Sequence, residues 1–393
     1  MIAITDAKVF TMEEETGILE NGTVLIKDKR ILSVGENMDI PADARRINAR
    51  GKLLFPGFIE AHCHMGITEE KKGREGDDCN ESVNPLTPYL RARDAINPMD
   101  AAFHNAVAAG ITSAMIGPGS SNVVGGRFAF VKTHGRCIDE MIRLEPAAMK
   151  VAFGENPKMN YGMKDTGPYT RMAIAGMLRE ELTCARNYVR RYPVQPKAGD
   201  EENAKEEFRY GCYRDVFSGK IPLKVHAHRA DDILTAIRIA NEFGLEITLD
   251  HCSEGHIIAE EIAMSGFPAI VGPDLASRNK IEVQNMAFKT AGELEKAGVC
   301  VAVTTDHPVS LIQSLPLCSA LAVKEGLSME GGLKALTISP ARICRMDHMV
   351  GSIRAGKLAD LVLFDGHPFE IFSKVLFTMI DGEIVYRGAE MYL

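Results

Sequence analysis

An apolar run ends in two histidines in the stretch Leu53-Leu54-Phe55-Pro56-Gly57-Phe58-Ile59-Glu60-Ala61-His62-Cys63-His64. A short apolar run of this kind indicates a buried strand. Residues two positions apart on a strand point to the same face, so the side chains of His62 and His64 lie together. If this strand ends at the mouth of a barrel, both imidazoles can reach one metal ion.

Further metal-type ligands follow at the ends of later apolar segments. Zinc, iron and manganese accept imidazole nitrogen and carboxylate oxygen, and catalytic sites keep a position open for water. A single histidine at a strand end is most simply explained as a core or surface residue. That explanation does not account for ligand-type residues at the ends of several successive strands. The sequence therefore predicts a divalent metal site whose candidate ligands are His62, His64, Lys150, Glu155, His226, His251 and Asp306.

Eight candidate strands occupy the middle of the chain, at 54–61, 111–116, 128–133, 148–154, 222–227, 246–250, 267–271 and 299–304. Helical patterns separate several of them, at 98–109, 171–191, 230–243, 257–264 and 292–297. This order predicts an α/β fold, a (β/α)8 TIM barrel, whose chemistry lies at the C-terminal strand ends. The connection 117–147 looks irregular, and the long polar segment 192–221 is expected to be a surface loop.

Both ends of the chain have strand patterns without helices between them. Residues 1–52 and 346–393 are therefore predicted to form one small β-sandwich domain, with the barrel at 53–345 inserted between them. Neither terminal segment has enough strands to be stable alone.

Composition narrows the function classes. The chain has 393 residues, 46% hydrophobic and 25% charged, which is ordinary for a soluble globular protein. A net charge of −8 argues against nucleic acid or an anionic membrane as the main partner. No run approaches the ~18 apolar residues of a membrane span, and no signal peptide is recognisable. The nine cysteines form no C-x-x-C pair, which suits a reduced cytoplasm better than a disulfide framework. We expect a cytoplasmic homo-oligomer that acts on a small molecule.

Several motifs together resemble the amidohydrolase superfamily: Pro56–His64, His226, His251, Thr305-Asp306 and the closing stretch Gly351–Val362. The resemblance spans nearly the whole chain and is strongest to the imidazolonepropionase-related and prolidase-like hydrolases. It implies a metal-dependent hydrolase that cleaves a C–N bond of an amide, cyclic amide or peptide-like substrate, with a metal-bound hydroxide as nucleophile.

The resemblance leaves two candidates for a ligand that bridges two ions. Some relatives use a carboxylated lysine on the fourth strand, which Lys150 matches, and others use a glutamate at a strand end, which Glu155 matches. The two are five positions apart and face opposite sides of a regular strand. Glu155 is slightly favoured because it lies nearer the expected mouth. One or two ions are expected, with zinc favoured and iron or manganese as alternatives.

Catalytic and substrate-binding roles are assigned to residues around the expected mouth. Asp306 is the expected proton acceptor, and His228, on the same face as His226, is the expected donor to the substrate carbonyl oxygen. Arg127 can hold a carboxylate in a fork, so a carboxylate-bearing substrate is favoured. The expected substrate-binding residues are Gly126, Arg127, Lys158, Arg229 and His307.

Two rival functions use the same residues. A deaminase would use the same metal site, but Ala230-Asp231-Asp232 follow the fifth strand where a glutamate would favour deamination. A non-catalytic scaffold stabilised by metal is the rival from another class. Structural metal sites are usually closed by four ligands, and five or six candidate ligands at an open mouth argue against that rival.

Overall fold

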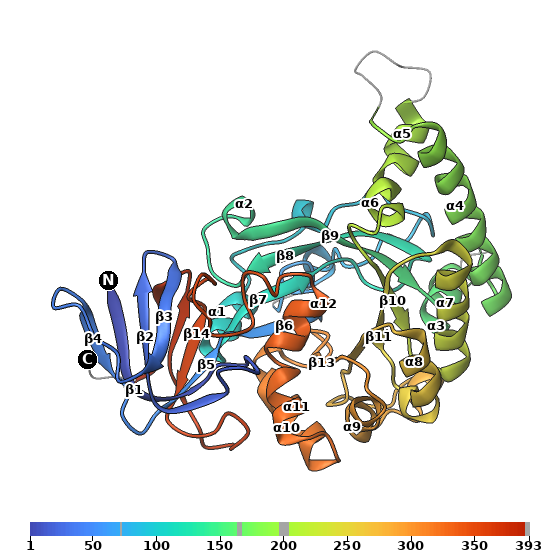
Figure 1. Cartoon of the computed structure of the whole chain (residues 1–393). Coiled ribbons are helices and arrows are strands. Elements are labelled where there is room, and N and C mark those ends of the chain that lie inside the picture. Colours follow the sequence, from blue (N-terminus) through green and yellow to red (C-terminus); the bar gives the residue numbers. More distant parts are fainter. Residues whose placement is uncertain (71–72, 163–166, 196–203, 390–393) are drawn as a thin grey trace.

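The computed structural model describes residues 1–70, 73–162, 167–195 and 204–389, and its strands form two sheets (Figure 1). The terminal sheet contains β1 (Ile2–Phe10), β2 (Ile18–Lys27), β3 (Arg30–Glu36), β4 (Arg45–Asn48), β5 (Leu53–Pro56), β14 (Leu361–Phe364), β15 (Val375–Ile380) and β16 (Glu383–Arg387). Its order is β16-β15-β14-β5-β1-β2-β3, and β4 pairs with β1.

The terminal sheet joins the two ends of the chain. Strand β14 pairs antiparallel with β5, with Val362 opposite Phe55. The inner side chains of both halves, among them Ile4, Leu54 and Phe377, belong to one buried apolar cluster. The two terminal segments are thus parts of one sheet, whereas the sandwich arrangement and the domain boundaries stay predictions.

The barrel sheet contains β6 (Phe58–Cys63), β7 (Ile111–Ile116), β8 (Val124–Lys132), β9 (Ile142–Ala152), β10 (Leu223–Ala227), β11 (Ile247–His251), β12 (Ala269–Val271) and β13 (Val301–Val303), paired in this order. The two end strands come close to each other, because the backbone N–H of His64, beyond β6, donates to the carbonyl of His307, beyond β13, at 2.8 Å. The sheet is therefore a nearly closed barrel, and each of the eight expected strands has its counterpart.

One strand runs against the expected direction. Strand β8 is antiparallel to both β7 and β9, whereas the other neighbouring strands are parallel. A parallel crossover needs a dozen or more residues, and the connections 117–123 and 133–141 are too short for one. The prediction of a regular (β/α)8 barrel was wrong at this strand. Because β8 is reversed, its first residues lie at the edge where the parallel strands end.

The expected strand 54–61 is divided between the two sheets. Strand β5 ends at Pro56 in the terminal sheet, and β6 starts at Phe58 in the barrel. Gly57 lies between them where a Cβ atom would come within 2.3 Å of the Thr112 side chain. The close packing of this turn against β7 therefore requires glycine.

Helices lie between and beyond the barrel strands: α1 (Ala101–Ala108), α2 (Ile138–Met141), α3 (Glu155–Pro157), α4 (Arg171–Arg191), α5 (Ala204–Tyr210), α6 (Arg214–Phe217), α7 (Ala230–Phe243), α8 (Ala259–Ser265), α9 (Lys289–Lys296), α10 (Leu315–Lys324), α11 (Met329–Lys334) and α12 (Ile338–Ile343). Helices α4 and α7 have the expected limits. Helix α1 starts later than expected because Asp100 caps it, accepting from the backbone N–H of Ala102. No described helix is long and apolar enough to cross a membrane.

The segment expected to be a surface loop, 192–221, is helical in part. Helices α5 and α6 occupy most of residues 204–217, while 196–203 lie outside the described residues. Arg209 of α5 forms an ion pair with the buried Glu181 of α4, and Tyr213 also donates to that carboxylate. These contacts hold α5 against the upper part of α4, away from the barrel (Figure 1). The expectation of a loop was wrong because the polar residues here bind α4 as well as solvent.

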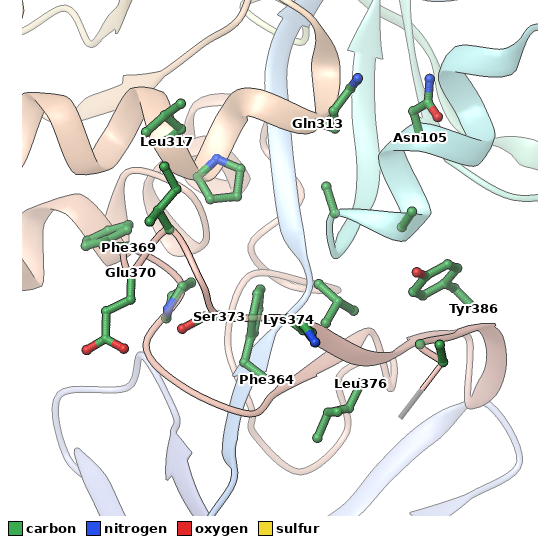
Figure 2. Close-up of a pocket in the computed structure, with 18 residues that line it drawn as sticks. Asn105, Gln313, Leu317, Phe364, Phe369, Glu370, Ser373, Lys374, Leu376 and Tyr386 are labelled. Atoms are coloured by element: carbon green, nitrogen blue, oxygen red, sulfur yellow. The ribbon is translucent and has the colours of Figure 1, made fainter. Parts of the chain in front are cut away.

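A cavity of about 620 Å³ lies at the junction of the terminal sheet and the barrel helices. Figure 2 shows Phe364 and Leu376 of the terminal sheet on one side of it, with Leu317 and Gln313 on the other. None of the expected metal ligands lines this cavity.

Candidate metal centre

The expected histidines converge at one end of the barrel. His62 lies in β6, His226 in β10 and His251 at the end of β11, and their side chains are almost completely buried. The ring centroids of His62 and His251 are 5.1 Å apart, and those of His226 and His251 are 4.5 Å apart. Two groups have ligand atoms within 4.8 Å of one another: His62, His251 and Asp306, and His226, His228 and His251.

Asp306 lies at the centre of the first group. Its Oδ1 atom is 3.2 Å from His64 Nε2 and 3.5 Å from His62 Nε2, and its Oδ2 atom is 4.0 Å from the nearer nitrogen of His251. Buried Oδ1 has no hydrogen-bond partner in the described structure. A buried carboxylate oxygen left in this state among imidazole nitrogens fits a cation site.

Three imidazoles, those of His62, His64 and His251, have their Nδ1 atoms next to an oxygen acceptor. The distances are 2.9 Å from His62 to Asp250 Oδ2, 2.7 Å from His64 to the Gly117 carbonyl, and 2.8 Å from His251 to the Gly272 carbonyl. A proton on Nδ1 leaves the lone pair on Nε2, which is the arrangement usual for metal-binding histidines.

Burial keeps most of these imidazoles neutral. It lowers the pKa of His62, His226 and His251 well below 6.5, and neighbouring cations lower the pKa of His62 further. His64 is different, because the Cys79 thiol and Asp306 outweigh burial and raise its pKa to about 10. An ion that bound to His64 would therefore have to displace a proton from it.

Sequence reasoning missed the acid that holds Asp306 in place. Glu60 is fully buried two positions before His62, and its carboxylate accepts from the hydroxyl of Thr304 at 2.6 Å and the backbone N–H of Thr305 at 2.9 Å. Burial raises its pKa to about 6. The period of two along β6 places Glu60 on the same face as His62, which was the available signal.

The Asp250–Lys224 pair was also missed. Asp250 is fully buried and lies 3.2 Å from Lys224 Nζ as well as 2.9 Å from His62. Alternation along β11 would point Asp250 and His251 to opposite faces. His251 has a φ of +78°, so the strand ends there and both side chains reach the site.

The two candidates for the bridging ligand have different surroundings. Lys150 is fully buried, its Nζ atom lies 3.3 Å from His62 Nε2, and burial lowers its pKa to about 8. The Glu155 carboxylate instead accepts from the backbone N–H of Glu282 at 3.4 Å. The geometry therefore brings Lys150 into the cluster and gives no support to the preference for Glu155 as a ligand.

A cavity of about 820 Å³ adjoins the cluster, with Arg127 on its wall. Cys79, whose thiol hydrogen-bonds to His64, and Gly125, which packs against Lys150, also line it. Arg127 donates to the carbonyl of Tyr89, and its buried Nε atom has no partner in the described structure.

The remaining expected substrate contacts have other surroundings. Gly126 has a φ of +123°, which favours glycine. Arg229 forms an ion pair with Asp231 at 2.9 Å, and half-buried Lys158 lies in the short π-helical segment Lys158–Gly162. His307 is buried, and its Nδ1 atom accepts from the backbone N–H of Ile312 at 3.1 Å. All of these assignments stay predictions.

Comparison with known proteins identifies the family. A model of the amidohydrolase family matches residues 214–385. The crystal structure of an amidohydrolase from Thermotoga maritima MSB8 is 39% identical, with a TM-score of 0.91 over 99% of this chain and 100% of that chain. The chain belongs to the amidohydrolase family. The resemblance inferred from the sequence motifs is thereby confirmed.

Two curated relatives of this amidohydrolase are more distant. Amidohydrolase tasK of Hapsidospora irregularis is 28% identical over 92% of the chain, which spans only 39% of the tasK sequence. The imidazolonepropionase of Cutibacterium acnes is 27% identical, over 92% of this chain and 88% of that protein.

Proposed function

We propose that this protein is a divalent-metal-dependent hydrolase of a carbon–nitrogen bond in a small, carboxylate-bearing amide or cyclic amide. The observation that carries the proposal is the unpartnered oxygen of Asp306 among imidazoles at the open end of the barrel. Family membership supports the reaction class, and Arg127 on the adjoining cavity supports the carboxylate.

The donor set fits a first-row divalent ion. His62 and His64 offer Nε2 lone pairs and Asp306 offers an oxygen, with His251 within reach. Such nitrogen-rich sites suit zinc, with iron and manganese as alternatives. When bound, the ion would supply Lewis acidity and lower the pKa of a water molecule. Lys150 Nζ lies 3.3 Å from His62 Nε2, and carboxylation of this amine would give it an anionic oxygen that could bind the ion.

Asp306 is the proposed proton acceptor. Burial alone would raise its pKa, but His251 and His64 lower it, so the carboxylate is ionised and can take a proton. It would take that proton from the attacking water and pass it to the leaving nitrogen. Thr304 holds the loop in this position, because its hydroxyl accepts from the backbone N–H of Asp306 at 3.0 Å.

An Asp306→Asn variant tests this role. Asparagine keeps the volume and one oxygen but cannot accept the proton, so kcat should fall on the order of 10²–10⁴-fold while bound metal is largely retained. Asp365→Asn, directly after β14 of the terminal sheet, is the control. Metal content would be measured by mass spectrometry. Turnover would be measured with a panel of N-acyl amino acids, dipeptides and cyclic amides. Near-normal turnover in Asp306→Asn would exclude the proposed role.

The same panel separates the rival functions. Hydrolysis of an amide yields a carboxylate and an amine, whereas deamination releases ammonia, which a coupled assay detects. A metal-replete protein that hydrolyses no member of the panel and releases no ammonia would favour the non-catalytic scaffold.

A further inference from the structure

A solvent-exposed phenylalanine borders the cavity of about 820 Å³ that adjoins the candidate metal ligands. Phe208 lies in α5 and is 66% exposed. Its ring stacks on that of Tyr89, with the ring centroids 5.0 Å apart and the planes tilted by 35°. A single exposed apolar side chain is ordinary, but this one lines a cavity together with a second ring. Most of the Phe208 side chain is therefore available to a molecule that enters the cavity.

Both neighbours of Phe208 in the sequence are fastened to other helices. The Glu207 carboxylate accepts two hydrogen bonds from the Arg214 guanidinium of α6, at 2.7 Å each. Arg209 forms an ion pair with Glu181 of α4, whose side chain is almost completely buried. These contacts fix the backbone on both sides of Phe208. A ligand that packs against its ring therefore meets a surface that is already in place, so less conformational entropy is lost on binding.

Tyr89 lies in a segment that pairs with the start of β8. The backbone N–H of Arg127, in β8, donates to the Leu90 carbonyl at 2.8 Å, and the Arg127 guanidinium donates to the Tyr89 carbonyl at 3.3 Å. Arg127, Tyr89 and Phe208 all line the same cavity. A ligand group that reaches the guanidinium of Arg127 is consequently next to the two aromatic rings.

The charges around this cavity favour a ligand with one carboxylate. Arg127 forms no ion pair with any described residue, and its Nε atom has no hydrogen-bond partner there. Arg91, which lines the same cavity, is by contrast paired with Glu145 at 2.9 Å. An arginine without an anionic partner can bind a ligand carboxylate in a fork. A second negative charge is disfavoured by the exposed carboxylates that also line the cavity, those of Asp77, Asp78 and Glu81.

We propose that Phe208 and Tyr89 select a substrate in which an aromatic or large apolar group lies next to a single carboxylate. The carboxylate would bind Arg127, and the apolar group would pack against the two rings. The inference deepens the proposed function and rests on it, because it names the substrate class of the same site. A phenyl ring in this position would bury apolar area that a methyl group in its place cannot bury. The preference for an aromatic substrate should therefore depend on Phe208.

Binding of two carboxylates that contain no amide tests the proposal without turnover. The probes are 3-phenylpropanoate and propanoate, and their affinities for the purified protein would be measured by ligand-observed NMR. We expect 3-phenylpropanoate to bind at least about 10-fold more tightly, from the apolar area that a phenyl ring buries. Phe208→Ala should remove most of this difference and leave the affinity for propanoate unchanged. The retained affinity for propanoate shows that the variant is folded.

Three further variants make the result specific. Phe372→Ala is the matched control, because it removes the same side chain from a position between β14 and β15 that is 90% exposed and does not line this cavity. It should leave both affinities unchanged. Phe208→Leu keeps a large apolar side chain and should retain most of the preference. Arg127→Met removes the cation and should weaken the binding of both probes.

Kinetics connect the preference to the reaction. With N-acetylphenylalanine and N-acetylalanine as substrates, Phe208→Ala should raise KM for the first about 10-fold and leave its kcat nearly unchanged, because the contact is equally strong in the ground state and the transition state. The KM for N-acetylalanine should not change.

The outcomes separate this inference from the proposed function. Equal affinities of the two probes for the wild-type protein, or a preference that survives in Phe208→Ala, would overturn the inference. Hydrolysis of amides without a preference that depends on Phe208 would also overturn it and leave the proposed function intact. A protein that shows the preference but hydrolyses no amide would overturn the proposed function and retain the inferred binding site.

Discussion

Replacing Asp250 with asparagine should weaken both the fold and the metal centre. The Asp250 carboxylate is fully buried, 3.2 Å from Lys224 Nζ and 2.9 Å from His62 Nδ1. Two unit charges at that first distance attract by about 5 kcal/mol at an effective dielectric constant near 20. Asparagine removes this attraction and leaves Lys224 buried without its anion. We therefore expect the free energy of unfolding to fall by about 3–5 kcal/mol.

The assay for Asp250→Asn is urea unfolding of the ion-free protein, followed by circular dichroism. Lys224→Met and the double variant complete a mutant cycle, in which the double variant should lose several kcal/mol less than the sum of the single losses. The ion held by His62 should bind roughly 10–100-fold more weakly in Asp250→Asn. Single losses that add within about 0.5 kcal/mol would refute the proposed coupling.

Two more predictions follow from buried contacts. Lys132→Met should lower the free energy of unfolding in urea by about 3–5 kcal/mol, because it leaves Asp360 buried without its cation. A decrease of less than about 1 kcal/mol would contradict this prediction. Zn²⁺ binding should release a proton from His64, whose pKa is about 10, so the affinity for Zn²⁺ should rise with pH. Calorimetry in buffers of different ionisation enthalpy measures the number of protons released. Binding without proton release would contradict the prediction.

Periodicity predicted the barrel strands well because buried strands have a simple apolar signature. The limits of α4 and α7 were predicted for a similar reason, since each has a long amphipathic pattern. The reversal of β8 was missed because direction depends on connection length, and the residues 117–147 had been assigned to an irregular connection. The division at Gly57 was missed because β5 and β6 follow each other in one mainly apolar stretch. Which sheet each strand joins depends on its pairing with β1 or with β7, and the local sequence does not show these partners.

The cluster of candidate metal ligands was predicted as far as these residues follow strand ends. His62, His64, His226, His251 and Asp306 all meet there. Glu282 lies on a turn, and no periodicity marks it. Its carboxylate accepts from the backbone N–H of Glu155, 127 positions away, a contact that only the folded chain reveals.

The pairing of β5 with β14 affects how the nascent chain folds. Strand β5 leaves the ribosome early, but the strand that covers its edge, Leu361–Phe364, follows roughly 300 residues later. At about 5–20 residues per second, synthesis of that interval takes on the order of 15–60 s. Throughout this time the first strands present an open edge, which is a site for aggregation. The terminal sheet can therefore be completed only after the last strands of the chain have been made.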